Sequence, residues 1–223
     1  MIILALETAT EACSAALNID GEIRERFEIA PREHSMLILP MLESLLTEAD
    51  ISLQQVDALA FGRGPGAFTG VRIGVGVAQG VAFGVDLPVL PISTLAALAQ
   101  ATDAVQVLAA IDARMDEVYW GSYRRDKGGL MYLQGEECVA APDATPTVSG
   151  EGWLGAGSGW NMYGDSLGAR HAGQVSGVAV DALPRAAAVS RLAVAAFVAG
   201  EAVGAEQALP VYLRDTVTWK KIR

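Results

Sequence analysis

The sequence predicts an α/β protein built from two similar units, residues 1–103 and 104–223. Both units open with strand patterns joined by short turns, and both continue with an apolar strand and an apolar helix. The order of three strands, helix, strand and helix therefore appears twice, loosely and without a close sequence repeat. A chain of 223 residues with 52% hydrophobic residues can bury a substantial core in one large or two small domains. The last segment can pack back on the first unit.

Three strands are expected at the start of the first unit. Apolar residues fill 2–6 and 12–19, whereas 22–29 alternates charged and apolar residues as a half-exposed strand does. Asp20 and Gly21 join the last two strands, and this pair is typical of a hairpin turn. We therefore expect an antiparallel meander.

Two apolar helices are expected in the same unit. Apolar side chains of residues 35–49 cover roughly 200° of the helix circumference, about twice the arc that one sheet needs. Residues 69–83 are apolar nearly all round, and their interior glycines each cost about 1 kcal/mol relative to alanine. The small residues form two ridges, one of Gly76, Gly80 and Gly84 and one of Gly70, Gly74, Ala78 and Ala82. Close packing against neighbouring backbones must compensate for the poor helix propensity.

Part of each of these helices should be exposed in a monomer, and contiguous exposed apolar surface marks an interface. The expected interface residues are Met36, Leu37, Met41, Leu45, Val71, Gly74, Val75 and Ala78. The second helix is too short to span a membrane, and Arg72 lies within it.

The loop before the second helix allows two interpretations. Gly64 to Gly66, followed by Thr69 at the helix start, could offer backbone N–H groups to a phosphate. The loop has neither the Gly-Lys-Ser/Thr ending of a P-loop nor a Gly-x-Gly-x-x-Gly fingerprint. A tight turn in which Thr69 caps the helix is therefore favoured.

The other expected elements follow from apolar runs and capping residues. The strands are 56–61, 89–92, 105–111, 118–123, 129–133 and 153–156. The helices are 95–101, capped by Ser93 or Thr94, and the alanine-rich segment 184–202.

Charge and cysteine content limit the function classes. The net charge of −10 repels phosphate backbones, so another subunit should supply most of the positive surface if nucleic acid is involved. A basic end, Lys220, Lys221 and Arg223, could touch RNA, although a solvated terminus is favoured. Cys13 and Cys138 form no CxxC pair, which indicates a reducing compartment, and Glu7 interrupts the first apolar run. We therefore expect a cytoplasmic protein without a membrane segment.

Residues with catalytic potential are sparse. His34 and His171 are the two histidines, and no cysteine lies near either in the sequence, which disfavours a His/Cys metal site. Asp112, Arg114 and Asp116 follow a strand end, where ligands often bind in α/β sheets, but an internal Asp–Arg pair is favoured. No catalytic residue is assigned.

Four separated stretches resemble one family: ILALETAT near the start, GRGPGAFTGVRIGVGVAQGVAFG at 62–84, DARMDEVYWG at 112–121 and PVYLRDTVTWKK near the end. Together they resemble the bacterial TsaB (YeaZ) family of tRNA threonylcarbamoyladenosine biosynthesis, and the similarity runs from end to end. The resemblance implies a two-lobed actin-like ATPase (ASKHA, ribonuclease H-like) fold with duplicated βββαβα lobes, the first lobe carrying the dimerisation helices. The implied fold is similar to that of the paralogous TsaD subunit, which transfers the threonylcarbamoyl group to tRNA.

The resemblance also implies a noncatalytic scaffold without a cofactor. Such a chain forms a heterodimer with TsaD, to which the ATPase TsaE binds, and forms a homodimer when alone. It supports modification of the adenosine 3′ of the anticodon in tRNAs that read codons beginning with A, and it meets tRNA only through the complex.

Two departures from the wider fold class bear on chemistry. TsaD has a metal-binding histidine pair, whereas Thr94 and Leu98 stand at those positions here, so no metal is expected. Actin-like kinases have an Asp-x-Gly turn at the first phosphate loop, whereas the corresponding residues here are Glu7, Thr8, Ala9 and Thr10. Glu7, Thr8 and Thr10 remain weak candidates for nucleotide contacts. The alternative is an actin-like enzyme in its own right, a small-molecule kinase or a metallopeptidase.

Overall fold

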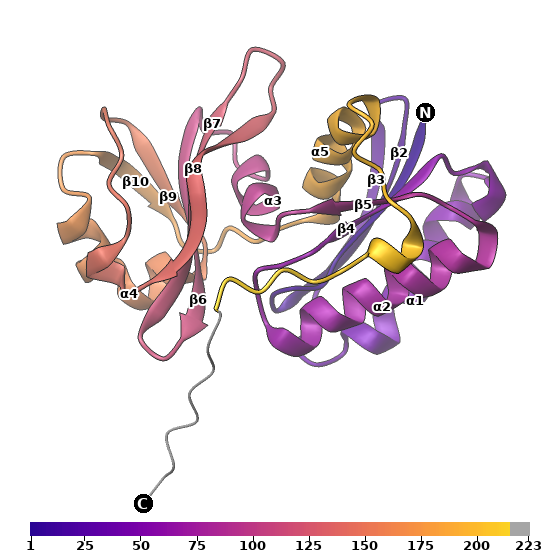
Figure 1. The fold of residues 1–223 in the computed structure, drawn as a ribbon, viewed down its shortest axis with the longest axis horizontal. Coiled ribbons are helices and arrows are strands. Elements are labelled where there is room, and N and C mark those ends of the chain that lie inside the picture. The colour runs from indigo at the N-terminus through magenta and orange to yellow at the C-terminus, as the bar shows by residue number, and fades with distance from the viewer. Residues whose placement is uncertain (215–223) are drawn as a thin grey trace, which may run out of the picture.

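The computed structural model describes residues 1–214, which contain two five-stranded mixed sheets (Figure 1). The strands of sheet 1 are β1 (Ile2–Glu7), β2 (Ala12–Ile19), β3 (Glu22–Ile29), β4 (Ala58–Gly62) and β5 (Val89–Ile92). The strands of sheet 2 are β6 (Gln106–Arg114), β7 (Glu117–Arg125), β8 (Met131–Ala140), β9 (Trp153–Ala156) and β10 (Val175–Ala179).

The two sheets have the same topology. Their orders are β3-β2-β1-β4-β5 and β8-β7-β6-β9-β10, so strands one to five of each unit take equivalent places. In both sheets the first three strands pair antiparallel and the last two join in parallel. The duplication predicted from element order is therefore confirmed at the level of the sheets.

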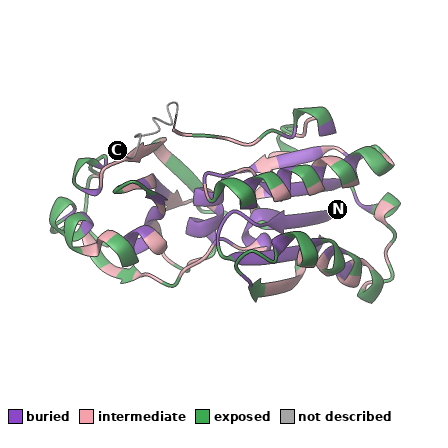
Figure 2. Ribbon diagram, turned by 90° about the horizontal axis from the view of Figure 1, so that it is seen from below, coloured by how far each residue is buried: buried purple, intermediate pink, exposed green. Residues whose placement is uncertain are grey.

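Helices cover both faces of each sheet. They are α1 (His34–Glu48), α2 (Phe68–Val85), α3 (Thr94–Gln100), α4 (Ser158–Arg170) and α5 (Ala186–Val198). The helices α1 and α2 pack on one face of sheet 1 and α5 on the other, whereas α3 packs on sheet 2 opposite α4. The last helix of each unit therefore lies on the sheet of the other unit, and α3 and α5 meet between the lobes. Figure 2 shows the inner strands of sheet 1 buried between helices with exposed outer faces, whereas the edge strand β3 is partly exposed.

The second unit differs from the predicted order in its helices. A short 3₁₀ turn, Pro142–Ala144, replaces the helix expected between its third and fourth strands. Helix α4 and strand β10 have no counterpart among the elements expected from the sequence. Glycines at 159, 164 and 168 lower the helix propensity of α4, and Tyr163 has non-helical backbone angles, so its pattern was not recognised. Packing on sheet 2 holds it in place instead.

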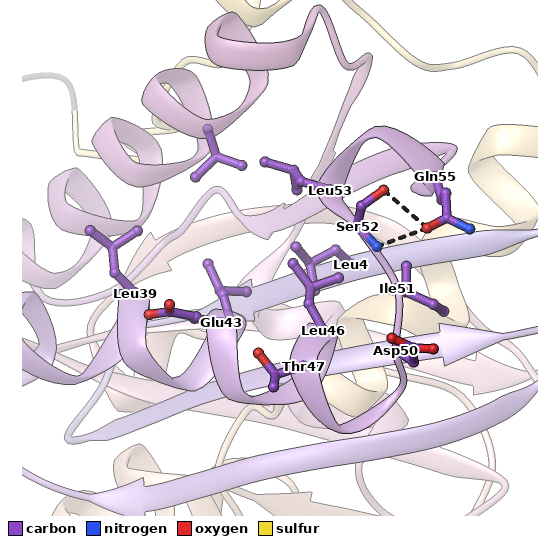
Figure 3. A pocket seen from close by; sticks show the side chains of 12 residues that line it. Leu4, Leu39, Glu43, Leu46, Thr47, Asp50, Ile51, Ser52, Leu53 and Gln55 are labelled. Carbon is purple, nitrogen blue, oxygen red and sulfur yellow. Dashed lines mark hydrogen bonds between the residues drawn. The ribbon is translucent and has the colours of Figure 1, made fainter.

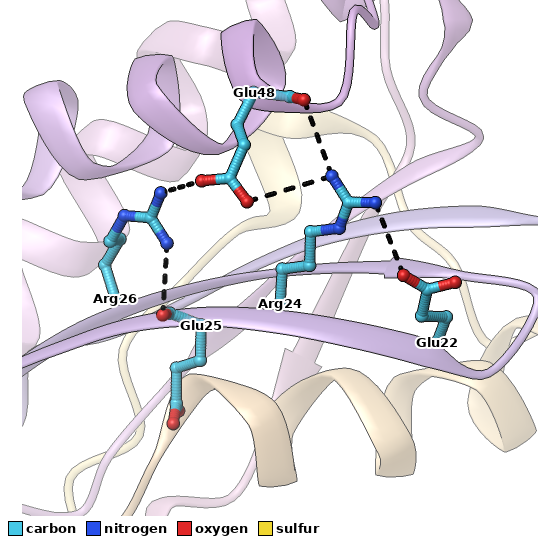
Figure 4. Close-up of polar contacts among 5 residues, drawn as sticks. All are labelled: Glu22, Arg24, Glu25, Arg26 and Glu48. Atoms are coloured by element: carbon cyan, nitrogen blue, oxygen red, sulfur yellow. Dashed lines mark hydrogen bonds and ion pairs between the residues drawn. The ribbon is translucent and has the colours of Figure 1, made fainter.

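Charged side chains of β3 fasten helices on opposite faces of sheet 1 (Figure 4). On one side, the carboxylate of Glu48 at the end of α1 accepts a hydrogen bond from Arg26. On the other side, Glu25 accepts two bonds from Arg185, at 2.9 and 2.6 Å, and one from the Ala187 N–H in the first turn of α5. Alternation along the strand sends neighbouring side chains to opposite faces, so one strand anchors both layers.

Among the described helices, α2 alone is long and apolar enough to cross a membrane by length and composition. It lies against β4 and β1 beside α1, and it carries Arg72. The core helix of a globular protein passes the same test.

Candidate functional site

The loop between β1 and β2 and the glycine loop before α2 lie against each other. Glu7 and Thr8 are each 1% exposed, and Thr10 is also buried. The Ala9 N–H donates to Glu7 Oε1 at 2.7 Å, and the Thr94 hydroxyl donates to Glu7 Oε2 at 3.0 Å. The Thr8 hydroxyl donates to the carbonyl of Gly70 at 2.8 Å. The structure therefore brings the three candidate nucleotide-binding residues together, but their side chains are engaged inside the protein.

Three glycines, at the end of β4, in the glycine loop and in the first turn of α2, make room for the β1–β2 loop. A Cβ at Gly62 would lie 2.0 Å from Glu7 Oε2, one at Gly66 2.4 Å from the Ala9 carbonyl oxygen, and one at Gly70 2.1 Å from the Thr8 carbonyl oxygen. These distances are far below van der Waals contact. At Gly66 and Gly70 the nearest atoms are backbone oxygens, so a side chain has no room, and at Gly62 it would displace the Glu7 carboxyl. The space that the missing side chains leave is filled by the protein itself, and this favours the turn interpretation over a phosphate cradle.

The predicted cap of α2 is wrong in one detail. Thr69 lies inside the first turn and is exposed, whereas the N-cap is Ala67, whose N–H donates to the Ala9 carbonyl at 2.7 Å. Contact with the β1–β2 loop therefore sets the start of α2. The prediction for α3 is confirmed, because the Ser93 hydroxyl accepts a bond from the Ala96 N–H at 3.2 Å.

Glu7 is a buried carboxyl, and its burial raises its pKa above the ordinary value. The hydrogen bonds from the Ala9 N–H and the Thr94 hydroxyl act in the opposite direction but are smaller. A carboxyl with a raised pKa in the folded state contributes stability that is complete below its unfolded pKa, about 4.3, and is lost as pH rises through its folded pKa. Glu7 therefore makes the folded state less stable as the pH rises from about 4.3 through its raised folded pKa, and its contribution stays constant above that pKa.

We predict that Glu7→Gln will flatten the dependence of unfolding free energy on pH between about pH 4 and pH 7. Glutamine keeps the shape and still accepts the Ala9 N–H, and its amide can donate to the Thr94 hydroxyl. Urea denaturation across this range is the measurement, with Glu22→Gln at an exposed carboxylate as the matched control. Parallel profiles for the Glu7 variant and the unchanged protein would contradict the assignment.

The structure corrects the residues expected at the α1–α2 interface. Leu45, Val71, Gly74, Val75 and Ala78 are buried inside the chain, whereas Leu37 and Met41 are half-buried and Met36 is 75% exposed. The ridge that contains Gly74 faces the core, where its Cβ would lie 2.7 Å from Thr8 Oγ1. Five of the eight residues are therefore unavailable to a partner.

The other glycine ridge faces outward. A Cβ on Gly76, Gly80 or Gly84 would meet no described atom within 4 Å. Phe83, on the same helix, is 62% exposed, and Leu39 on α1 is half exposed. We call this surface the docking face: Met36, Leu39, Gly76, Gly80, Phe83 and Gly84.

A groove of about 630 Å³ lies beside the docking face, between α1, α2 and the loop that follows α1 (Figure 3). Leu39, Leu46 and Val81 provide apolar walls. The rim is polar, and Ser52 and Gln55 are hydrogen-bonded to each other there at 2.8 and 3.0 Å. An apolar groove with a polar rim can accept an apolar side chain of another chain.

The remaining candidates have structural partners. His34 is buried, with Nε2 3.2 Å from the Ala12 carbonyl. His171 is buried between Thr145 and Gln174, and burial lowers its pKa. Within residues 1–214, no group of three or more His, Cys, Asp or Glu side chains could hold a metal ion.

At the end of β6, Asp112 and Arg114 form the predicted ion pair, at 2.9 Å, with the arginine mostly exposed. Thr94 and Leu98 are buried in α3. The basic residues Lys220, Lys221 and Arg223 lie outside the described residues.

Two sheets of identical topology, with helices exchanged between the lobes, define a two-lobed protein of the actin-like, ribonuclease H-like class. A family model described as TsaD, tRNA N6-adenosine threonylcarbamoyltransferase, matches residues 27–209.

Relatives that match along the whole chain narrow this class. The tRNA threonylcarbamoyladenosine biosynthesis protein TsaB of Escherichia coli K12 is 47% identical over all of this chain and 98% of the relative. TsaB of Haemophilus influenzae is 42% identical over all of this chain and 97% of the relative. The solved structure of YeaZ from Pseudomonas aeruginosa superposes with a TM-score of 0.87 at 49% identity, covering 95% of this chain and 99% of that one. The chain therefore belongs to the TsaB (YeaZ) family.

Proposed function

We propose that this chain is a noncatalytic scaffold subunit that binds a TsaD chain through the docking face. With TsaE bound to the heterodimer, it supports transfer of the threonylcarbamoyl group to the adenosine 3′ of the anticodon in tRNAs that read codons beginning with A. The observation that carries the proposal is the outward glycine ridge of α2, where nothing described fills the space above the backbone. Membership of the TsaB family supports a role in tRNA threonylcarbamoyladenosine biosynthesis.

The geometry of the docking face fits a helix of a second chain. Exposed Gly76 and Gly80 let another backbone approach α2 closely, and helices pack ridges into grooves. Met36 in the first turn of α1 and Phe83 in the last turn of α2 are exposed and provide apolar area for the contact. A TsaD chain of the same fold can present equivalent helices and form a four-helix contact. A second copy of this chain would use the same surface, so homodimer and heterodimer exclude each other.

A noncatalytic role is supported by the residues at the two positions that bind phosphate or metal in related folds, the first loop and the start of α3. The first loop packs into the glycine loop, and Glu7 is bonded to Ala9 and Thr94 inside the protein. Thr94 and Leu98 offer no imidazole for a metal. We therefore propose that the chain needs no cofactor, binds nucleotide weakly at best and acts in the cytoplasm. The net charge of −10 favours tRNA contact through the complex alone.

Co-purification with TsaD, followed by tRNA modification assays, tests the proposal. We expect the two chains to elute together, and TsaD with TsaE to modify tRNA only when this chain is added. Transfer or hydrolysis catalysed by this chain alone would favour the alternative of an independent actin-like enzyme. Full modification of tRNA without it would contradict the scaffold role.

A further inference from the structure

The segment that follows α5 returns across the first lobe. It pairs with β5 through a bridge between Val89 and Val203 and then lies along α2. The Gln79 amide of α2 donates to the Ala208 carbonyl at 3.0 Å. From this contact the segment continues along the first lobe and reaches the second lobe.

The next part of the segment is held at the start of α2. The Val211 N–H donates to the Arg63 carbonyl at 2.9 Å, and the guanidinium of Arg72 donates to the Tyr212 hydroxyl at 2.9 Å. The same guanidinium lies 3.7 Å above the ring of Phe68, whose centroid is 5.9 Å from that of Tyr212. The two hydrogen bonds and the Phe68–Tyr212 ring contact therefore hold the segment on the first lobe, and the cation–π contact with Phe68 positions the Arg72 guanidinium for its bond to Tyr212.

Only two residues beyond Tyr212, the chain contacts the second lobe. Arg214 donates to the carbonyls of Ala113 and Arg114, at 3.2 and 3.4 Å, and to the carboxylate of Glu117. Its side chain is 18% exposed. Figure 1 shows the yellow segment leaving the first lobe and ending beside β6.

The turn that receives Arg214 is strained. Arg114, Met115 and Asp116 have φ values of 62°, 57° and 59°, so three consecutive residues other than glycine are left-handed. Each is an unfavourable backbone conformation for an L-residue and persists only where the surroundings hold it. Arg214 binds carbonyls at the start of this turn and the carboxylate just after it, which holds both ends.

We propose that residues 203–214 are a strap that couples the opening of the lobes to the conformation of the β6–β7 turn. From Val211 to Arg214 the chain spans at most about 11 Å when fully extended. Both ends of this stretch are bonded, one to each lobe, so a separation of the lobes larger than the slack of these few residues and the Arg214 side chain releases one end. Release at either end loosens or removes the Arg214 bonds, which leaves the strained turn held by the pairing of Arg114 with Glu117 and by Asp112 alone.

The test is hydrogen exchange of the intact chain measured by mass spectrometry. In Arg214→Ala we expect exchange of residues 113–117 to accelerate about tenfold, because a charged group with several bonds is lost. The decisive variant is Arg72→Ala, which cuts the strap at the first lobe and touches no residue of the turn. We expect exchange in the turn to accelerate about threefold there as well, as coupling across the strap requires.

Arg191→Ala, at an exposed arginine of α5, is the matched control and should leave exchange in the turn unchanged. Urea denaturation of each variant separates local opening from a change in global stability. If Arg72→Ala loosens only the segment around Tyr212 and exchange in the turn stays the same, the strap does not couple the lobes and the proposal is wrong.

Discussion

Replacement of Gly80 by glutamate is expected to abolish association with TsaD while leaving this chain folded. The new side chain would project from the outward ridge of α2, where a Cβ meets no described atom within 4 Å. In the free chain it is solvated, and the loss of an interior glycine stabilises the helix by about 1 kcal/mol. In the complex, the carboxylate would be buried without a partner against another backbone. Burial of this unpaired charge costs about 3 kcal/mol or more of binding free energy, which is roughly a hundredfold or greater loss of affinity for TsaD.

Calorimetric titration with TsaD measures this effect, and sedimentation of the isolated chain measures homodimerisation. The matched control is Gly168→Glu, the same substitution at an exposed glycine of α4 in the second lobe, where a Cβ also meets no described atom. We expect the control to bind TsaD normally. Wild-type affinity of the Gly80 variant, with an unchanged circular dichroism spectrum, would show that the interface lies elsewhere.

Gly70→Ala is expected to destabilise the protein by about 3 kcal/mol, through overpacking at a site with no room. The added methyl would lie 2.1 Å from the carbonyl oxygen of Thr8, and this oxygen belongs to the backbone and cannot rotate away. Movement of the β1–β2 loop would also disturb the bond from the Thr8 hydroxyl to the Gly70 carbonyl. The same substitution at Gly76 should stabilise the protein by about 1 kcal/mol, because its Cβ is free and alanine favours the helix.

Urea denaturation of both variants measures the two changes in unfolding free energy, which we expect to have opposite signs. Since Gly70 and Gly76 lie in one helix, a difference in sign reports the side of the helix and not its propensity. Stabilisation by both substitutions would mean that the β1–β2 loop does not pack on α2 as described.

Much of the fold could be predicted from local patterns. The helix expected at 69–83 is observed at Phe68–Val85, and the hairpin expected at Asp20 and Gly21 joins β2 and β3. Apolar periodicity and turn chemistry act within a few residues, so they can be recognised in the sequence. The second unit was harder, because the glycines of α4 hide a helix that packing on sheet 2 maintains.

The sequence predicted an interface on the small-residue surface of α2, but it did not predict which side of the helix faces outward. The two small-residue ridges of α2 are equivalent by helical periodicity, and the prediction placed Gly74 at the interface. In the structure, the Gly74 ridge receives the β1–β2 loop, and the Gly80 ridge is exposed. The residue pattern predicts two faces of α2 that allow close packing. The β1–β2 loop, more than sixty residues earlier in the chain, decides which of the two is buried.

The sequence by itself therefore determined the α/β class, the first four strands of each unit, the lack of a histidine pair at Thr94 and Leu98, and the apolar excess of α1 and α2. Only the tertiary structure decided that Glu7 closes the first loop, that α3 and α5 exchange sheets, and that the chain returns from α5 to Arg214. The first group depends on neighbouring residues, whose spacing and chemistry are written along the chain. The second depends on contacts between segments far apart in sequence, and these form only once the sheets place them side by side.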